Sequence, residues 1–81
     1  MSTAVIIHGF VVIGVDENYL GRAKSWMGKE PRDAFVFTSE QIAGLRKLKK
    51  QFVKPAVAIY AATYDPETRT TTVDFSTQEE F

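Results

Sequence analysis

The sequence predicts a single small α+β domain, in which a four-stranded, mostly antiparallel sheet packs against one main helix. The chain has 81 residues, which is enough for one domain and no more. Segments 4–15 and 56–64 are rich in the β-branched and aromatic residues that suit strands. A capped amphipathic segment at 39–52 lies between them and has helical spacing. The expected order is therefore strand, strand, helix, strand, strand.

The first expected strand, 4–15, is apolar on both of its faces. One face would carry Val5, Ile7, Val11, Ile13 and Val15, and the other Ile6, Phe10 and Val12. Such a strand usually lies centrally in a sheet and is covered on both sides. Gly9 predicts a bulge or a bend. The run is too short to span a bilayer as a helix and no basic residue precedes it, so we expect a soluble protein.

The second expected strand, 19–27, follows a turn at 16–18 and would pair with the first strand as an antiparallel hairpin. Residues 28–31 contain glycine and proline and break this strand. One short helical turn is expected at 31–34. A brief extended segment at 35–37 then leads into the main helix.

The clearest local signal is the start of the helix at 39–52. Thr38 and Gln41 have the spacing of a capping box, and Ser39 is a rival cap. Gly44 weakens the helix interior by roughly 1 kcal/mol relative to alanine, which predicts a neighbour packed closely against it. The apolar stripe of the helix consists of Ile42, Leu45, Leu48 and Phe52.

Two more strands are expected after the helix, at 56–64 and 69–75. The turn between them, at 65–68, contains a proline that presets the backbone and an aspartate that can accept backbone hydrogen bonds. Residues 76–81 are polar and acidic, and we predict that they form a mobile tail. The domain itself would then cover residues 1–75.

One helix covers only part of four strands, so one face of the predicted sheet stays open. This face would carry Phe10, Tyr60 and Tyr64. An open apolar face of roughly a few hundred Å² normally marks an interface, and a symmetric homodimer formed sheet to sheet is the simplest way to cover it. The alternative is that a long loop of the same chain folds over this face.

The composition excludes several classes of function. Ten basic and ten acidic residues give a net charge of zero, which argues against a protein that depends on phosphate attraction. No cysteine is present, which excludes disulfides, cysteine metal sites and thiol catalysis and fits a reducing cytoplasm. His8 has no partner spaced to form a metal site or a catalytic pair, and most carboxylates fall in turns or the tail. We therefore predict no enzyme activity, no metal and no cofactor.

A basic cluster late in the helix is the largest charge asymmetry in the chain. It can bind phosphates or an acidic protein surface, or it can be the solvated end of a helix whose dipole it complements. A second basic group surrounds the predicted hairpin and would support binding if it adjoined the helix. The first group is Arg46, Lys47, Lys49, Lys50 and Lys54, and the second is Arg22, Lys24, Lys29 and Arg32.

Apolar contact residues are expected in the hairpin, where Trp26 lies in a polar run. Tryptophan and tyrosine are enriched in binding hot spots, although tryptophan is also a common core residue. If Trp26 is exposed, Tyr19 and Met27 would join it as apolar anchors. The predicted contact surface then combines the basic face of the helix with these hairpin residues.

Residues 19–45 carry a resemblance to known proteins. A hairpin with a tyrosine and a tryptophan is followed by Asp-Ala-Phe-Val-Phe at 33–37, and Thr-Ser-Glu-Gln-Ile-Ala at 38–43 then opens a helix. This order resembles a loose pattern in very small proteins encoded by bacteriophages and prophages. The resemblance implies a non-catalytic inhibitor, such as an anti-CRISPR protein, that acts in the cytoplasm of a bacterial host. Its partner would be a host protein or nucleoprotein complex.

Three hypotheses follow from the sequence. The leading one is a phage-type interaction protein that blocks a host protein or complex and can act as a homodimer. The second is a small nucleic-acid-binding module that uses the cations of the helix, with an affinity that falls steeply with salt. The third is an enzyme whose site is built from turn carboxylates.

Overall fold

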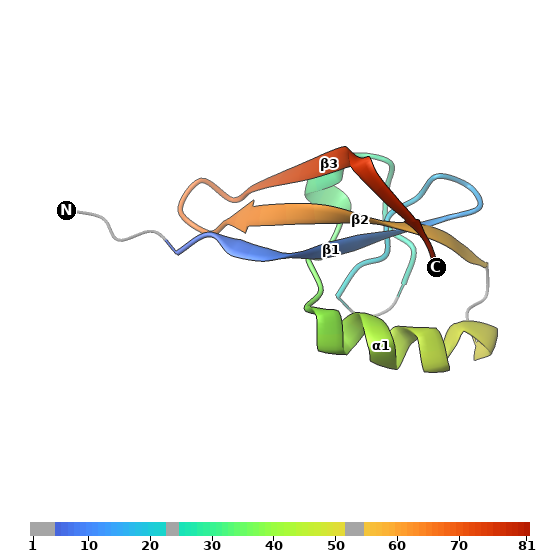
Figure 1. The fold of residues 1–81 in the computed structure, drawn as a ribbon. Helices are drawn as coiled ribbons and strands as arrows, with labels where there is room; N and C mark the ends of the chain where they lie inside the picture. The colour runs from blue at the N-terminus through green and yellow to red at the C-terminus, as the bar shows by residue number, and fades with distance from the viewer. Residues whose placement is uncertain (1–4, 23–24, 52–54) are drawn as a thin grey trace.

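The structure, a computed structural model, describes residues 5–22, 25–51 and 55–81. Within these ranges the chain forms three strands, one α-helix and two short 3-10 helices. In chain order they are β1 (Ile7–Gly14), η1 (Pro31–Asp33), α1 (Ser39–Lys47), η2 (Lys49–Gln51), β2 (Ala56–Asp65) and β3 (Thr70–Glu80). The strands form one antiparallel sheet in the order β1-β2-β3, and α1 lies beside one face of it (Figure 1).

The predicted four-stranded sheet is wrong, because the described part of 19–27 forms no strand. This segment makes only isolated bridges, which join Ile13 to Tyr19 and Leu20 to Trp26. The two ends of this segment are hydrogen-bonded to each other, since the Met27 N–H donates to the Tyr19 carbonyl at 2.8 Å. Leu20 and Trp26 both contact the same core cluster, so the chain turns back within a few residues instead of extending along β1. The order of the elements is accordingly β1, α1, β2, β3.

The core consists of two clusters of buried residues. The helix-side cluster lies between the sheet and α1 and contains Val12, Leu20, Phe37, Ile42, Leu45 and Ile59. The loop-side cluster contains Val11, Tyr19, Val36 and Ala62. Val11 and Val12 are adjacent in β1, are both fully buried and belong to different clusters. β1 is therefore covered on both faces at its middle, as predicted. The predicted central position is wrong, because β1 is at one edge of the sheet, and Ile7 at its N-terminal end is 42% exposed.

The second face of the sheet is covered by this chain itself. Tyr19 and Val36, from the connection between β1 and α1, pack there against β1 and β2. The three residues predicted to share an open face do not share one. Phe10 packs against the helix-side cluster, whereas Tyr60 and Tyr64 pack against the loop-side cluster. The described residues thus support the loop alternative for the part of this face around Val11 and Ala62, whereas Phe75, whose ring meets the Tyr60 ring edge-on, is 58% exposed.

The outer edge of β1 is closed by the segment that leads into α1. Phe10 and Phe37 exchange two backbone hydrogen bonds of 2.8 and 2.7 Å. Gly9 permits this approach, because a Cβ at that position would collide with the Phe37 carbonyl oxygen. The predicted bulge or bend at Gly9 is not found, since the register shift in β1 lies between Ile13 and Gly14. Gly9 is needed for close backbone contact instead.

The predicted start of the helix is confirmed. The Thr38 hydroxyl accepts from the Gln41 backbone N–H at 3.1 Å, and the Gln41 side-chain carbonyl accepts from the Thr38 backbone N–H at 2.8 Å. The predicted end is too late, because α1 stops at Lys47 and the backbone tightens at Leu48. There the Leu48 N–H donates to Leu45, three residues back, at 3.0 Å. The short helix η2 follows, and Phe52 lies outside the described residues.

Replacing Thr38 with alanine should lower the free energy of unfolding by about 1 kcal/mol, because the Gln41 N–H loses its acceptor at the helix end. Urea unfolding followed by circular dichroism measures the change. Ser39→Ala is the matched control, since the structure gives Thr38, and not Ser39, the cap bond. Equal losses in the two variants would contradict the observed cap.

Strand β3 continues to Glu80 rather than ending at Phe75, and it bends on the way (Figure 1). Its register to β2 shifts between Ile59 and Ala61, which pair with Glu79 and Asp74. The extra residues are held by Asp74, whose carboxylate accepts from the Ser76 hydroxyl at 2.6 Å and the Ser76 N–H at 3.1 Å. Thr77 completes the bulge by donating to the Asp74 carbonyl and accepting from the Ala61 N–H. Residues 76–80, predicted as a tail, thus follow the sheet.

Candidate binding surface

The predicted apolar anchors do not form one surface. Tyr19 is only 2% exposed and belongs to the loop-side cluster, so its side chain is not available to a partner. Burial raises the pKa of its phenol, and Tyr60 and Glu30 raise it further. Trp26 is half-buried, and its ring lies against Gly14, where a Cβ would be 3.0 Å away. Met27 alone of the three is largely exposed, at 56%.

The basic cluster of the helix is divided by the structure. The Arg46 guanidinium donates to the Glu80 carbonyl at 3.0 Å and lies over the Phe81 ring, 5.9 Å from its centroid. Arg46 therefore connects α1 to the end of β3. Lys47 and Lys50 are exposed. Two predicted contacts, Lys54 and the side chain of Lys49, lie outside the described residues.

The second basic group contributes to a pair of adjoining hollows between α1 and the segment that precedes it. The first hollow has a volume of about 570 Å³ and the second about 500 Å³. Both have Arg22, Phe35 and Gln41 in their walls, and we call the pair the arginine groove. The first hollow is also lined by Ile7, Arg32 and Tyr64, and the second by Gly44, Leu45 and Leu48. Lys29 lines neither hollow, and Lys24 is outside the described residues.

The walls of the arginine groove are fixed by contacts that also form the core. The Phe35 N–H donates to the Leu20 carbonyl at 3.2 Å, and the Phe35 ring meets the Phe37 ring edge-on with centroids 4.9 Å apart. The side-chain carbonyl of Gln41 is engaged in the helix cap, which leaves its amide nitrogen for a ligand. These contacts hold Phe35 in the walls of both hollows, beside Arg22 and Gln41.

Gly44 keeps the second hollow open. The sequence predicts a neighbour packed closely against this glycine, but a Cβ built there meets nothing within 4 Å. That prediction is wrong, and Gly44 instead lines the space above α1. A glycine inside a helix costs about 1 kcal/mol relative to alanine, and no packing against Gly44 offsets this cost.

The arginine groove is positively charged and otherwise mostly apolar. Arg22 and Arg32 are exposed and are the charged residues in its walls, and no aspartate or glutamate lines either hollow in the described part of the chain. Arginine presents several N–H donors in a planar fork that matches a carboxylate or a phosphate. The groove therefore suits a ligand that combines apolar groups with negative charge.

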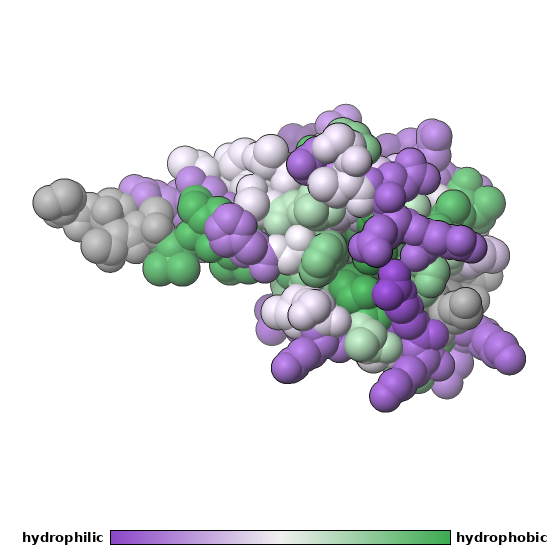
Figure 2. All heavy atoms as spheres, viewed as in Figure 1, coloured by the Kyte–Doolittle hydropathy of each residue, from purple (hydrophilic) through white to green (hydrophobic). Residues whose placement is uncertain are grey.

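Apolar side chains also gather at the N-terminal end of β1, whereas hydrophilic ones surround α1 (Figure 2). The exposed apolar residues of that end are Val5, Ile6 and Ile7. Ile7 is part of the wall of the first hollow, so this apolar stretch borders the arginine groove.

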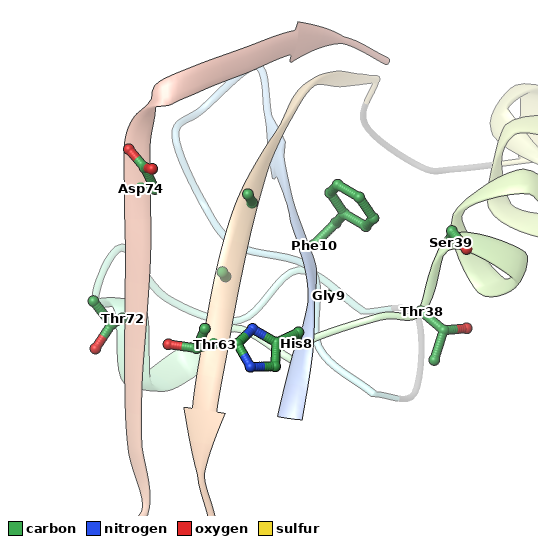
Figure 3. A pocket seen from close by; sticks show the side chains of 10 residues that line it. His8, Gly9, Phe10, Thr38, Ser39, Thr63, Thr72 and Asp74 are labelled. Carbon is green, nitrogen blue, oxygen red and sulfur yellow. The ribbon is translucent and has the colours of Figure 1, made fainter. Parts of the chain in front are cut away.

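A further hollow of about 580 Å³ lies over β1, β2 and β3 beside the start of α1 (Figure 3). Its walls include His8, Ser39 and Asp74, but these side chains come from separate elements and no hydrogen bond joins them among the described residues (Figure 3). The Ser76 hydroxyl and N–H lower the pKa of Asp74 by binding its carboxylate. The hollow thus gives His8 no acidic partner and Ser39 no base. Groups of three or more histidines or carboxylates that could hold a metal are likewise absent from the described residues.

The sequence places Arg22 and Arg32 in one basic group but does not show which segment they face. Phe35, which lines both hollows, lies in a segment expected only to be extended. Gly44 was the available signal, since a glycine in an otherwise regular helix needs a reason.

Among the described residues, the helices are all too short or too polar to cross a membrane. Comparison of the chain with protein-family models, with curated proteins and with solved structures finds no match in any of the three.

Proposed function

We propose that the chain is a non-catalytic binding protein whose partner contacts the arginine groove. The observation that carries this proposal is the combination of an aromatic residue, Phe35, with Arg22 and Arg32 in the groove walls, while no aspartate or glutamate of the described ranges lines either hollow. Binding pockets are typically apolar with a few polar groups that fix orientation. Arginine and aromatic residues are also the types most enriched at interface centres.

The resemblance of residues 19–45 to small phage and prophage proteins supports a more specific form of this proposal. In that form the protein is an inhibitor, of the anti-CRISPR type, that occupies a surface of a host protein or nucleoprotein complex in the bacterial cytoplasm. Inhibition of this kind needs no cofactor and no reactive side chain, because it acts by covering a surface.

A nucleic-acid-binding module is the alternative. It is supported by Lys47 and Lys50, which are exposed on and just after α1. Because Arg46 is engaged with Glu80 and Phe81, the described helix offers few cations to a phosphate backbone. Zero net charge further weakens long-range attraction to nucleic acid.

The proposed function is tested by capture from a nuclease-treated bacterial lysate, identification of the captured protein, and reassembly from purified components. We expect one protein that forms a stable complex with the purified chain. Light scattering gives the mass of this complex directly. Binding of a purified oligonucleotide by the purified chain, with an affinity that falls steeply with salt and is lost in Lys47→Gln/Lys50→Gln, would favour the alternative. If nothing reassembles with the purified chain, the proposal is wrong.

A further inference from the structure

We infer that the ligand of the arginine groove is an extended, acidic peptide segment, which places apolar side chains in the hollows and carboxylates on Arg22 and Arg32. This inference rests on the proposed function and specifies the chemistry of the partner. Its basis is charge complementarity, because both arginines lie in the groove walls and no acidic residue does so among the described residues. Neither arginine has an ion-pair partner in that part of the chain.

The shape of the groove favours an extended chain. Its two hollows adjoin along Arg22, Phe35 and Gln41 and have similar volumes, about 570 and 500 Å³. In an extended peptide every second side chain points to the same side, so neighbouring hollows can accept residues that are two apart. The intervening residues point outward, and acidic residues at the flanks can reach the arginines. A long phosphate backbone would instead need a row of cations, which the walls of the groove do not provide.

Gly44 is the second, independent observation. The open space above it forms part of the second hollow and lies beside the apolar Leu45 and Leu48. A Cβ here meets nothing within 4 Å, and a residue other than glycine would improve helix stability, yet a longer side chain would fill the hollow. In a helix a leucine side chain points toward the preceding turn, which here contains Gln41. The absence of a side chain at Gly44 thus keeps free the place where we put an apolar residue of the peptide.

The direct test uses a short synthetic peptide, the glutamate peptide, in which two leucines that are two residues apart are flanked on both sides by glutamates. It is titrated into the intact chain and followed by amide chemical shifts. We expect saturable shifts at Arg22, Phe35 and the Gln41–Leu48 part of the chain. Replacing glutamate with glutamine should weaken binding, and replacing it with lysine should abolish it. Absence of saturation up to about 1 mM of the glutamate peptide would overturn the inference. Equal binding of the lysine peptide would also overturn it.

Variants locate the site and separate binding from folding. Arg22→Gln and Arg32→Gln should each lower the affinity for the glutamate peptide roughly tenfold, because each variant loses charge-assisted hydrogen bonds. Lys47→Gln and Lys50→Gln remove the same charge outside the groove and should change affinity less than about twofold. Gly44→Leu should raise the melting temperature and still weaken binding at least about tenfold. Full binding by Gly44→Leu, or a loss confined to the lysine variants, would refute the proposed site.

The same variants distinguish failure of this inference from failure of the proposed function. If the wild-type chain reassembles with a captured protein and both arginine variants and Gly44→Leu do so equally well, the groove is not the contact. The acidic-peptide inference and the groove as binding site then fail together, and only a binding function at another surface remains. If the wild-type chain reassembles with nothing, the binding function itself fails. A competition experiment compares a short single-stranded oligonucleotide with the glutamine version of the peptide, each displacing the glutamate peptide. If the oligonucleotide is the better competitor, the ligand is a nucleic acid and the acidic-peptide assignment is overturned.

Discussion

Replacing Leu20 with alanine should lower the free energy of unfolding by about 3 kcal/mol, through lost apolar contacts and the cavity left behind. Leu20 is 0% exposed and is among the largest fully buried side chains. It also lies where the connection between β1 and α1 meets the sheet, since its N–H donates to Val12 and its carbonyl accepts from Phe35. The bonded neighbours limit how far the backbone can collapse into the cavity. In a domain of this size such a loss removes much of the total stability.

Urea unfolding of the wild type and of Leu20→Ala, followed by circular dichroism at 222 nm and by tryptophan fluorescence, measures this effect. Met27→Ala is the control, because it removes a side chain of similar size that is 56% exposed, and it should cost less than about 0.5 kcal/mol. Similar losses in the two variants would mean that the connection does not pack on the sheet as the structure has it.

Replacing Gly9 with alanine should destabilise the fold by about 2 to 3 kcal/mol, although it adds only one methyl group. A Cβ at Gly9 would collide with the Phe37 carbonyl oxygen and approach Cγ1 of Val36 to 2.8 Å. The Phe37 carbonyl oxygen is a backbone atom, so it cannot relieve the collision by a change of rotamer as a flexible side chain can. The segment would have to move away from β1 and strain the two hydrogen bonds between Phe10 and Phe37. Phe35 belongs to the same segment, so binding in the arginine groove should weaken as well.

The matched control is the same substitution at Gly44, where we expect the opposite sign. A Cβ at Gly44 meets nothing within 4 Å, and alanine in a helix interior is favoured over glycine by about 1 kcal/mol. Thermal and urea unfolding of the two variants side by side compares them directly. If both variants were stabilised, close approach of the Val36–Phe37 segment to β1 would be excluded.

The sequence predicted the elements whose signals are local. The capping box of Thr38 and Gln41 fixes where α1 begins, and β-branched alternation with a proline turn predicts β2 followed by β3. The error at 19–27 has a physical reason. Aromatic and apolar residues there favour a strand, but Leu20 is fully buried in the helix-side cluster, and the segment bridges to β1 only between Ile13 and Tyr19 among the described residues. Strand preference is weak compared with the burial of a large side chain.

The candidate site was less predictable, because it depends on tertiary contacts. Arg22 and Arg32 come to one groove only because the connection from Tyr19 to Phe37 crosses the outer side of β1. Arg46 shows the reverse case: its position in the helix predicts a free cation, and the approach of β3 engages it with Glu80 and Phe81. Residue spacing gives the face of a helix but does not show which distant segment covers that face.

The bulge in β3 has a consequence for how the protein behaves at high concentration. β3 is an edge strand of 11 residues, and a straight edge of that length would be a template on which further chains could stack into filaments. The hydrogen bonds of Asp74 with Ser76 and Thr77 bend this edge, so it offers no long continuous ladder. Negative charge at Asp74, Glu79 and Glu80 repels a second copy in register. We therefore expect the bend to disfavour amyloid-like growth along this edge.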